Sequence, residues 1–246
     1  MARMRPFHAI AGALALICAP GCAQPSMSTD AFTSPEVASL ADAVRRGDDA
    51  EIRRQLERVD ANTPGSDGSS LLIEAIRQGQ VASVQALLAG GADPNRANAR
   101  GDTAVHAAAF SGNAGLLRAV LAGGGDPNVR NPHTGATPLV SALLSPEARQ
   151  FEVLLDAGAD ADVADLNGDT PLHVAARTNA GAAILRLLAA GASPLAENSG
   201  GKSFQPYYFG YRRELLNDRA LDERRQVVAW LKANGVPLEA PVQDTD

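Results

Sequence analysis

Short apolar blocks alternate with polar turns along most of this 246-residue chain, and the alternation has a fixed period. One landmark is a glycine that precedes an apolar block opened by Thr or Ser. It recurs at intervals of 33, 34, 33 and 33 residues, at Gly68, Gly101, Gly135, Gly168 and Gly201. A second landmark follows each aliphatic run, again 33 or 34 residues apart, at Asp60, Asp93, Asp126, Asp160 and Ser193. Two landmarks in phase indicate stacked structural repeats.

The pattern predicts a pair of helices in each repeat. The Thr or Ser is placed to cap the first helix, and Pro138 and Pro171 follow it in the first helical turn, where proline is tolerated. Glycines such as Gly91 and Gly191 close the second block, where a left-handed residue ends a helix. The predicted helix pairs span residues 36–46 and 50–58, 70–78 and 81–89, 103–110 and 114–122, 137–144 and 146–156, and 170–177 and 180–189.

The tetrad Thr170-Pro171-Leu172-His173 resembles the signature of the ankyrin repeat, whose unit is 33 residues long. Residues 103–106 and 137–140 match the signature in part, and residues 70–73 and 203–206 are degenerate. The resemblance implies an all-α ankyrin-repeat solenoid of about six helix-turn-helix units, with short β-turn fingers and atypical terminal caps. It also implies that His106 and His173 hydrogen-bond backbone turns between adjacent repeats.

These patterns divide the chain into four segments. Residues 1–22 are predicted to be a signal peptide, 23–34 a flexible tether, 35–238 the ankyrin-repeat domain and 239–246 a disordered tail. The predicted units of the domain are residues 35–65, 66–97, 98–130, 131–164, 165–197 and 198–238.

The N-terminal 22 residues have the pattern of an export signal. Arg3 and Arg5 precede an apolar stretch, residues 9–19, that is too short to span a bilayer as a helix. The small residues before Cys22 resemble a bacterial lipobox, although Ala19 stands where that family prefers Leu. The resemblance predicts lipidation of Cys22 and a periplasmic protein anchored to the outer membrane. Cleavage after Ala23 without lipidation is the competing interpretation.

Composition and charge narrow the range of functions. Hydrophobic residues make up 45% of the chain and aromatic residues only 4%, so small aliphatic side chains must fill the layers between helices. The formal net charge is −6, and without residues 1–22 the count is 20 basic against 28 acidic residues, or −8. Such a chain is not expected to bind nucleic acid.

No catalytic or metal-binding pattern occurs in the sequence. It has no nucleophile elbow, phosphate loop or zinc-binding helix motif. The Asp residues fall at turn positions, where the side chain bonds its own backbone. Cys18 and Cys22 are the only cysteines, and both lie in the predicted signal. We therefore predict a protein that is not an enzyme and that needs no cofactor or metal.

Alignment of the repeats places one residue per unit in a column, two positions before the turn between the paired helices. Its members are Arg77, Phe110, Leu144 and Arg177. The resemblance places this column in the concave groove, where large apolar side chains can contact a partner. The alternative for Phe110 and Leu144 is burial against a neighbouring finger. Arg130 and His133 join the predicted groove, since the fourth finger has one extra residue and insertions often map to the binding face.

The last unit departs from the period, because Gly191 and Gly235 are 44 residues apart, 11 more than one repeat. The excess is assigned to residues 202–224, which combine aromatic and basic side chains. Partner contacts are predicted at Tyr207, Tyr208, Phe209, Tyr211 and Arg212. The other interpretation is that these aromatic residues close the open end of the stack, and the two roles can coexist.

Together these features predict a monomeric, non-enzymatic module in the bacterial envelope that binds another protein through its concave groove. Its sharpest form is an immunity protein that neutralises a toxin, a role that some exported bacterial ankyrin-like proteins have. An envelope scaffold or a helper of a periplasmic enzyme is the alternative. Membrane contact is expected only through the lipid anchor.

Overall fold

The structure, a computed structural model, describes residues 32, 34–66, 68–145 and 149–239. This part of the chain has no strand; it contains twelve α-helices and a short 3-10 helix, η2 (Arg213–Leu215). The α-helices are α1 (Pro35–Arg46), α2 (Asp49–Leu56), α3 (Leu71–Arg77), α4 (Val81–Ala89), α5 (Ala104–Phe110), α6 (Ala114–Ala122), α7 (Pro138–Leu143), α8 (Arg149–Asp156), α9 (Pro171–Arg177), α10 (Gly181–Ala189), α11 (Gln205–Phe209) and α12 (Asp218–Ala233). The all-α prediction is confirmed.

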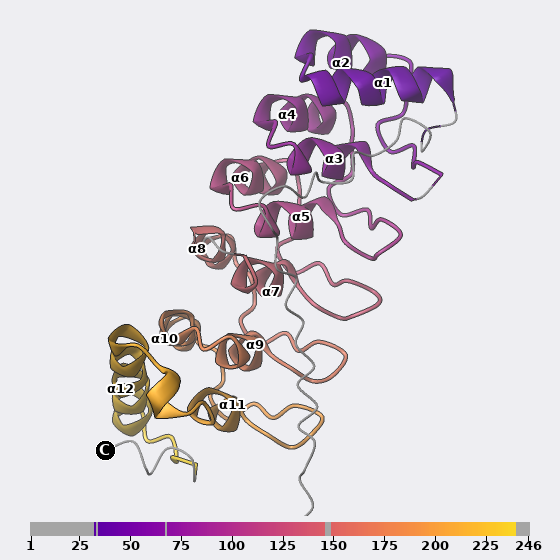
Figure 1. Ribbon diagram of the computed structural model, residues 1–246. Coiled ribbons are helices and arrows are strands. Elements are labelled where there is room, and N and C mark those ends of the chain that lie inside the picture. Colours follow the sequence, from indigo (N-terminus) through magenta and orange to yellow (C-terminus); the bar gives the residue numbers. More distant parts are fainter. Residues whose placement is uncertain (1–31, 33, 67, 146–148, 240–246) are drawn as a thin grey trace, which may run out of the picture.

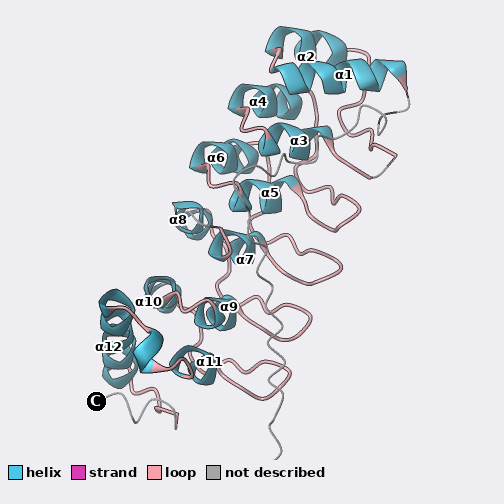
Figure 2. Ribbon diagram, viewed as in Figure 1, coloured by secondary structure: helices cyan, strands magenta, loops and turns pink. Residues whose placement is uncertain are grey.

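The helices form two parallel rows, as Figure 1 shows: odd-numbered helices in one row and even-numbered helices in the other. Most helices pack on their counterpart in the next pair, as α5 does on α7 and α4 on α6; the exception is the step from α8 to α10. The loops between pairs project beyond the odd-numbered row (Figure 2). We call these loops the fingers and number each by the unit whose first helix follows it, so that the first unit has no finger. The arrangement is the predicted solenoid of six helix pairs, in which each unit contacts mainly its neighbours.

Local signals start and end the helices where the sequence pattern predicts. The side chains of Ser70, Asn113 and Asn217 accept hydrogen bonds from backbone N–H groups in the first turns of α3, α6 and α12. Helix α4 ends just before Gly91, whose φ of 90° is the left-handed value that a glycine adopts without strain. The bounds of α1 to α7, α9 and α10 lie within two residues of their predicted positions; the predicted start of the eighth helix, at residue 146, lies outside the described residues.

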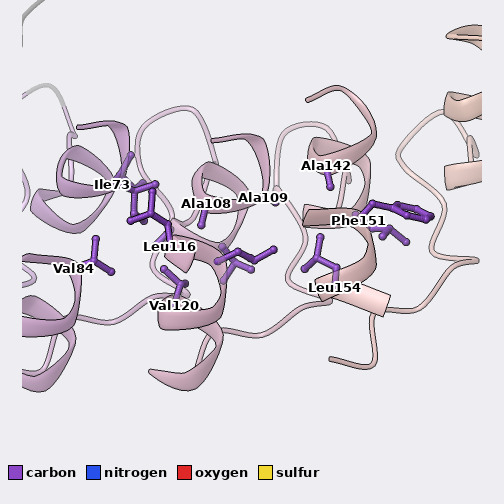
Figure 3. Packing of buried hydrophobic residues seen from close by; sticks show 14 of the residues in the cluster. Ile73, Val84, Ala108, Ala109, Leu116, Val120, Ala142, Phe151 and Leu154 are labelled. Atoms are coloured by element: carbon purple, nitrogen blue, oxygen red, sulfur yellow. The ribbon is translucent and has the colours of Figure 1, made fainter. Parts of the chain in front are cut away.

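A continuous aliphatic core fills the space between the two rows (Figure 3). Small side chains such as Ala108 and Ala142 lie on the odd-numbered helices, whereas Leu116, Val120 and Leu154 come from the even-numbered ones. The odd-numbered helices also bury branched side chains, such as Leu72 and Ile73 of α3, so both rows fill the volume between them. The core is therefore shared between units, because no single helix pair could bury its own apolar face.

The two buried histidines link successive units. The backbone N–H of Thr103 lies 3.3 Å from Nδ1 of His106, so this nitrogen must accept the bond. The other ring nitrogen, Nε2, then carries the proton and donates to the carbonyl of Ala136 at 3.1 Å. His173 repeats the arrangement, with Nε2 2.8 Å from the carbonyl of Lys202. The structural role that the resemblance implied for both histidines is confirmed.

A row of asparagines makes a second set of bridges between units, to backbone groups that directly follow the even-numbered helix of the next unit. Asn95 Oδ1 accepts the backbone N–H of Asp126 at 2.7 Å, and its Nδ2 donates to the carbonyl of Gly124 at 2.9 Å. Asn62 and Asn128 make equivalent pairs of bonds with the units that follow them. Each bridge satisfies both ends of the amide, so the fingers are fixed in register with one another.

The last unit corrects the sequence prediction about where the extra residues lie. Helix α11 keeps the period, because it packs on α9 as α9 packs on α7. The excess follows Tyr211: it consists of the connection containing η2 and of α12, which has 16 residues where α10 has nine. The aromatic residues of α11 therefore replace the small residues of earlier odd-numbered helices and are not inserted.

The packed part of the chain begins before the predicted domain boundary. Phe32, in the segment assigned to a flexible tether, is only 6% exposed and belongs to the hydrophobic core. Its ring adds apolar area at the first unit, which has no preceding unit to cover it. The predicted signal, the remainder of the tether except Ser34, and residues 240–246 of the predicted tail lie outside the described residues.

Candidate functional site

The aligned column of the sequence forms one surface in the structure. Arg77, Phe110 and Arg177 are the last residues of α3, α5 and α9, and Leu144 directly follows α7. We call these four residues the groove column. The side chains of Phe110 and Leu144 are 55% and 54% exposed, so the alternative that a neighbouring finger buries them is wrong. Two large apolar side chains thus face solvent on adjacent odd-numbered helices.

The ends of the odd-numbered helices face the bases of the fingers. Arg177 makes a two-point ion pair with Asp169, the residue after the fifth finger's glycine, with Nη2 2.7 Å from Oδ1. Asn198 of the next finger donates to the same carboxylate at 2.7 Å. At α9, the groove column therefore lies in the corner between the helix end and the bases of two fingers.

Arg177 is held in place before any partner arrives. Its guanidinium carbon lies 4.6 Å from the ring centre of Tyr207, and the hydroxyl of Tyr211 donates to its carbonyl oxygen. Partial burial opposes ionisation of Asp169, but the hydrogen bonds from Arg177 and Asn198 outweigh it and lower the pKa of this carboxyl. The charge of Arg177 is thus compensated within the chain.

Four further basic side chains flank the apolar pair without a carboxylate partner among the described residues. Arg96 donates to the carbonyl of Asn62 at 2.7 Å, and Arg130 donates to the carbonyl of Ala164 at 2.6 Å. Arg77 and Arg100 are exposed. In the fingers, these two carbonyls hold the guanidinium groups of Arg96 and Arg130 in place. Because a carbonyl is neutral, the positive charges of both arginines stay uncompensated. Among the described residues, these four guanidinium groups are therefore individual cations that an acidic group of a partner can approach.

The longer fourth finger is closed by the side chain of Asn131. Its Oδ1 accepts the backbone N–H groups of His133 and Thr134 at 2.9 and 3.2 Å, and its Nδ2 donates to Asp102 at 2.9 Å. The carbonyl of Thr134 then accepts the N–H of Leu166 in the next finger. The extra residue is thus absorbed in a rigid turn, with the imidazole of His133 exposed at its tip.

The aromatic segment divides into an interior and an exterior part. Tyr208 and Phe209 are 0% and 4% exposed, so their prediction as partner contacts is wrong and their role is to fill the end of the stack. Tyr207 is half-buried in the groove corner, whereas Tyr211 is 39% exposed and Arg212 is also exposed. Arg224 of α12 holds this segment in place, because it donates hydrogen bonds to the carbonyls of Tyr208 and Tyr211 at 2.6 and 3.1 Å.

Three leucines that are exposed in the structure were not predicted from the sequence as surface residues. Leu166 is 64% exposed at the tip of the fifth finger, Leu195 is 59% exposed, and Leu215 is 76% exposed on η2. For Leu195 a signal was present, since it occupies the position at which Asn62, Asn95 and Asn128 bridge to the next unit. At the equivalent position of the preceding unit, Asp162 still accepts the backbone N–H of Ser193 at 2.8 Å, but leucine cannot make that bridge, so the row of bridges ends at Leu195.

Other surface features carry no further chemistry. A cavity of about 460 Å³ lies between the fourth, fifth and sixth units, with Phe151 and Ala183 in its lining and the ion pairs Arg186–Glu152 and Arg219–Glu223 beside it. Within the described residues, no three His, Cys, Asp or Glu side chains gather as a metal site. In the same part of the chain, no helix is long and apolar enough to cross a membrane.

Comparison with known proteins identifies the family of the repeats. The family described as "Ankyrin repeats (3 copies)" matches residues 40–131 and 110–198. Protein PhlB of Serratia liquefaciens is 42% identical over 141 residues, which are 57% of this chain and 62% of PhlB; the chain thus spans less than two thirds of that relative. The crystal structure of the ankyrin repeat domain of Bcl-3, described as a unique member of the IkappaB protein family, superposes with a TM-score of 0.68 at 25% identity. The match covers 78% of this chain and 85% of that one.

Proposed function

Because this chain belongs to the ankyrin-repeat family, a fold that typically serves protein–protein interaction, we propose that it is a non-enzymatic, monomeric module that binds one protein along the groove column. The observation that carries the proposal is the exposed pair Phe110 and Leu144, set side by side on packed helices. Exposed apolar side chains between basic residues have the composition of a binding site.

The energetic argument rests on burial and rigidity. Full burial of a fully exposed side chain of this size contributes about 1.5–3 kcal/mol, and because Phe110 and Leu144 are 55% and 54% exposed, a partner gains roughly half of that at each. The helix ends that carry them are fixed by the shared core and by the bonds between fingers, so little conformational entropy is lost on binding. Two anchors on a rigid surface can therefore dominate the affinity, as hot spots do in other interfaces.

The test is affinity capture of partners from a detergent-solubilised envelope fraction with the full chain as bait. Phe110→Asp and Leu144→Asp place a charge in the groove column and should each abolish capture of a specific protein. Leu215→Asp is the matched control, because Leu215 is also exposed but lies outside the groove, and it should capture normally. Circular dichroism of each variant checks that the fold is retained.

The outcomes separate the candidate surfaces. Loss of the partner in both groove variants, with retention in the control, supports the proposal. Unchanged capture in both groove variants would reject this groove as the site. Loss in Leu215→Asp alone would move the site to the C-terminal unit, near Tyr211 and Arg212.

We further propose that the protein is exported and held in the periplasm by a lipid on Cys22. The basis is the sequence of residues 1–22, which precede the described part of the chain. Metabolic labelling with a fatty acid should mark the parent protein but not Cys22→Ser. An unlabelled parent protein would favour simple export with cleavage after Ala23.

The finer proposal is that the captured protein is a toxin that this module neutralises. Pre-arranged guanidinium groups without carboxylate partners, beside two exposed apolar side chains, suit tight, fast binding of a partner with acidic groups. Co-expression should protect cells from the captured protein, and Phe110→Asp should remove the protection. Capture of a protein that is harmless when expressed alone would point instead to an envelope scaffold or a helper of a periplasmic enzyme. Turnover of any substrate by the purified chain would overturn the non-enzymatic assignment.

A further inference from the structure

The groove column has a regular spacing that restricts the shape of a partner. Helices α5 and α7 pack directly on each other, and Phe110 and Leu144 occupy the same position at their ends. Packed helices lie about 8–10 Å apart. The two exposed side chains are therefore separated by about one such step along the stack, with Arg77 one step beyond Phe110 and Arg177 one step beyond Leu144.

This step fits a helix better than a strand. Residues seven apart in an α-helix lie on nearly the same face and about 10.5 Å apart along its axis. Residues on one face of a strand repeat at about 6.7 or 13 Å, so neither spacing matches. A partner helix lying along the stack can place one apolar residue on Phe110 and another, seven residues later, on Leu144.

The charges around Phe110 and Leu144 indicate which kind of residue the two ends of the partner helix should carry. Arg77, Arg100 and Arg130 have no carboxylate partner among the described residues. The carboxylates of Glu74 and Asp102 keep their charges but are held by the amides of Gln78 and Asn131, and neither forms an ion pair with these arginines among the described residues. A partner with acidic groups over this surface gains attraction, whereas a basic partner is repelled.

We infer that the partner presents an amphipathic α-helix that lies along the stack. It carries apolar residues at positions i and i+7, over Phe110 and Leu144, and acidic residues at i−7 and i+14, over Arg77 and Arg177. The inference rests on the proposed function and names the chemistry of the segment that occupies the groove.

The two ends of the helix are not equivalent. The charge of Arg177 is compensated by Asp169, while Arg77 has no such partner. The acid at i−7 therefore contributes more than the acid at i+14, and the partner's orientation follows from which of its ends is more acidic. Removal of the Arg77 charge should accordingly weaken binding more than removal of the Arg177 charge.

The probe is a fluorescein-labelled model helix of about four heptads, long enough to span the groove column at 1.5 Å per residue. The matched peptide carries Leu at i and i+7 and Glu at i−7 and i+14 on a neutral helical background. One control moves the second Leu to i+9, on the opposite face, and another replaces both Glu by Lys. Binding to the full chain is followed by fluorescence anisotropy at low and physiological salt.

The matched peptide should bind at least about ten-fold more tightly than either control at low salt, and salt should reduce this advantage. Phe110→Asp should abolish its binding, and Arg77→Glu should weaken it about three- to ten-fold, more than Arg177→Glu does. A peptide with Lys at i−7 should recover the affinity for Arg77→Glu, which a merely structural effect would not produce.

Equal binding of all three peptides, or preference for the Lys peptide, would overturn the inference. If envelope capture depends on Phe110 while the peptides show no discrimination, the groove still binds a protein and only the acidic-helix inference fails. If neither capture nor peptide binding depends on Phe110, both proposals fail.

Discussion

Two buried histidines show how single side chains join one repeat to the next. Each accepts a backbone N–H at the start of its own helix and donates to a carbonyl of the following unit. The ring therefore satisfies two backbone groups that would otherwise be buried without partners. Leaving such groups unpaired costs about 1–3 kcal/mol each, so the effect of one imidazole is large for a small unit.

His173→Ala tests this role. It removes the bond to the carbonyl of Lys202 and the capping interaction with Thr170, and should lower the free energy of unfolding by about 1–3 kcal/mol. Urea denaturation followed by circular dichroism measures the change. His133→Ala alters an exposed imidazole and should be neutral; equal effects in both variants would contradict the assignment.

The buried imidazole of His106 makes stability depend on pH. Burial lowers its pKa, although the carbonyl of Ala136 and the Asp102 carboxylate act in the opposite direction. Below about pH 6.5 the unfolded chain binds a proton that the folded chain resists, so stability falls as the pH is lowered. The lowered pKa of Asp169 makes stability fall with pH only under more acidic conditions, below about pH 4.

Denaturation midpoints at pH 7 and pH 5 check this expectation. The parent protein should be less stable at pH 5, and His106→Gln, which cannot be protonated, should lose less stability between the two values. An identical pH dependence in parent and variant would show that other groups are responsible.

At the scale of secondary-structure elements, α12 differs from every other even-numbered helix. It has 16 residues and begins after a connection that the other units lack. Its Arg224 is 4% exposed and donates to two carbonyls at the end of α11. Burial lowers the pKa of this guanidinium, yet its hydrogen bonds join α11 and α12 at the place where the chain departs from the period.

Arg224→Met keeps most of the side-chain volume and removes both bonds. It should lower the free energy of unfolding by about 1–3 kcal/mol, because two carbonyls lose a charged donor. The neighbouring Arg225→Met is the control, since Arg225 is exposed and pairs only with Asp222 across one turn. A neutral Arg224→Met would mean that the arginine does not hold the two helices together.

At the scale of the whole molecule, both ends of a stack must cover apolar surface that an interior unit leaves to its neighbours. At the C-terminal end α12 packs on α10 and buries Leu187 and Leu188, while Arg225 and Lys232 of α12 are exposed. At the N-terminal end Phe32 adds an aromatic ring to the core. The last unit therefore has a structural role whether or not it also contacts a partner.

Removal of residues 198–246 tests the cap. The shortened chain should expose the apolar face of α10, associate with itself and unfold at a lower urea concentration than the full chain. Light scattering and denaturation curves measure both effects. A soluble, monomeric fragment with an unchanged midpoint would contradict a capping role for the last unit.

Much of the fold could be predicted because its signals are local. The glycine and aspartate periods, the capping Thr and Ser residues and the proline positions fix where each helix starts and ends. Alignment of the units also placed Phe110 and Leu144 in one column, but it left burial against a neighbouring finger open, and the structure decided that both are exposed. The prediction was poorest in the last unit, where there is no following unit to set those surroundings.

The sequence by itself therefore determined the number of units, their register and the column of residues along the groove, because each is encoded within one period. Only the tertiary structure decided that Tyr208 and Phe209 lie inside while Tyr211 lies outside, and that Arg177 is compensated by Asp169 while Arg77 is not. Burial and charge pairing depend on side chains that meet from different units. A periodic pattern specifies where those units stand, but not what each side chain contacts there.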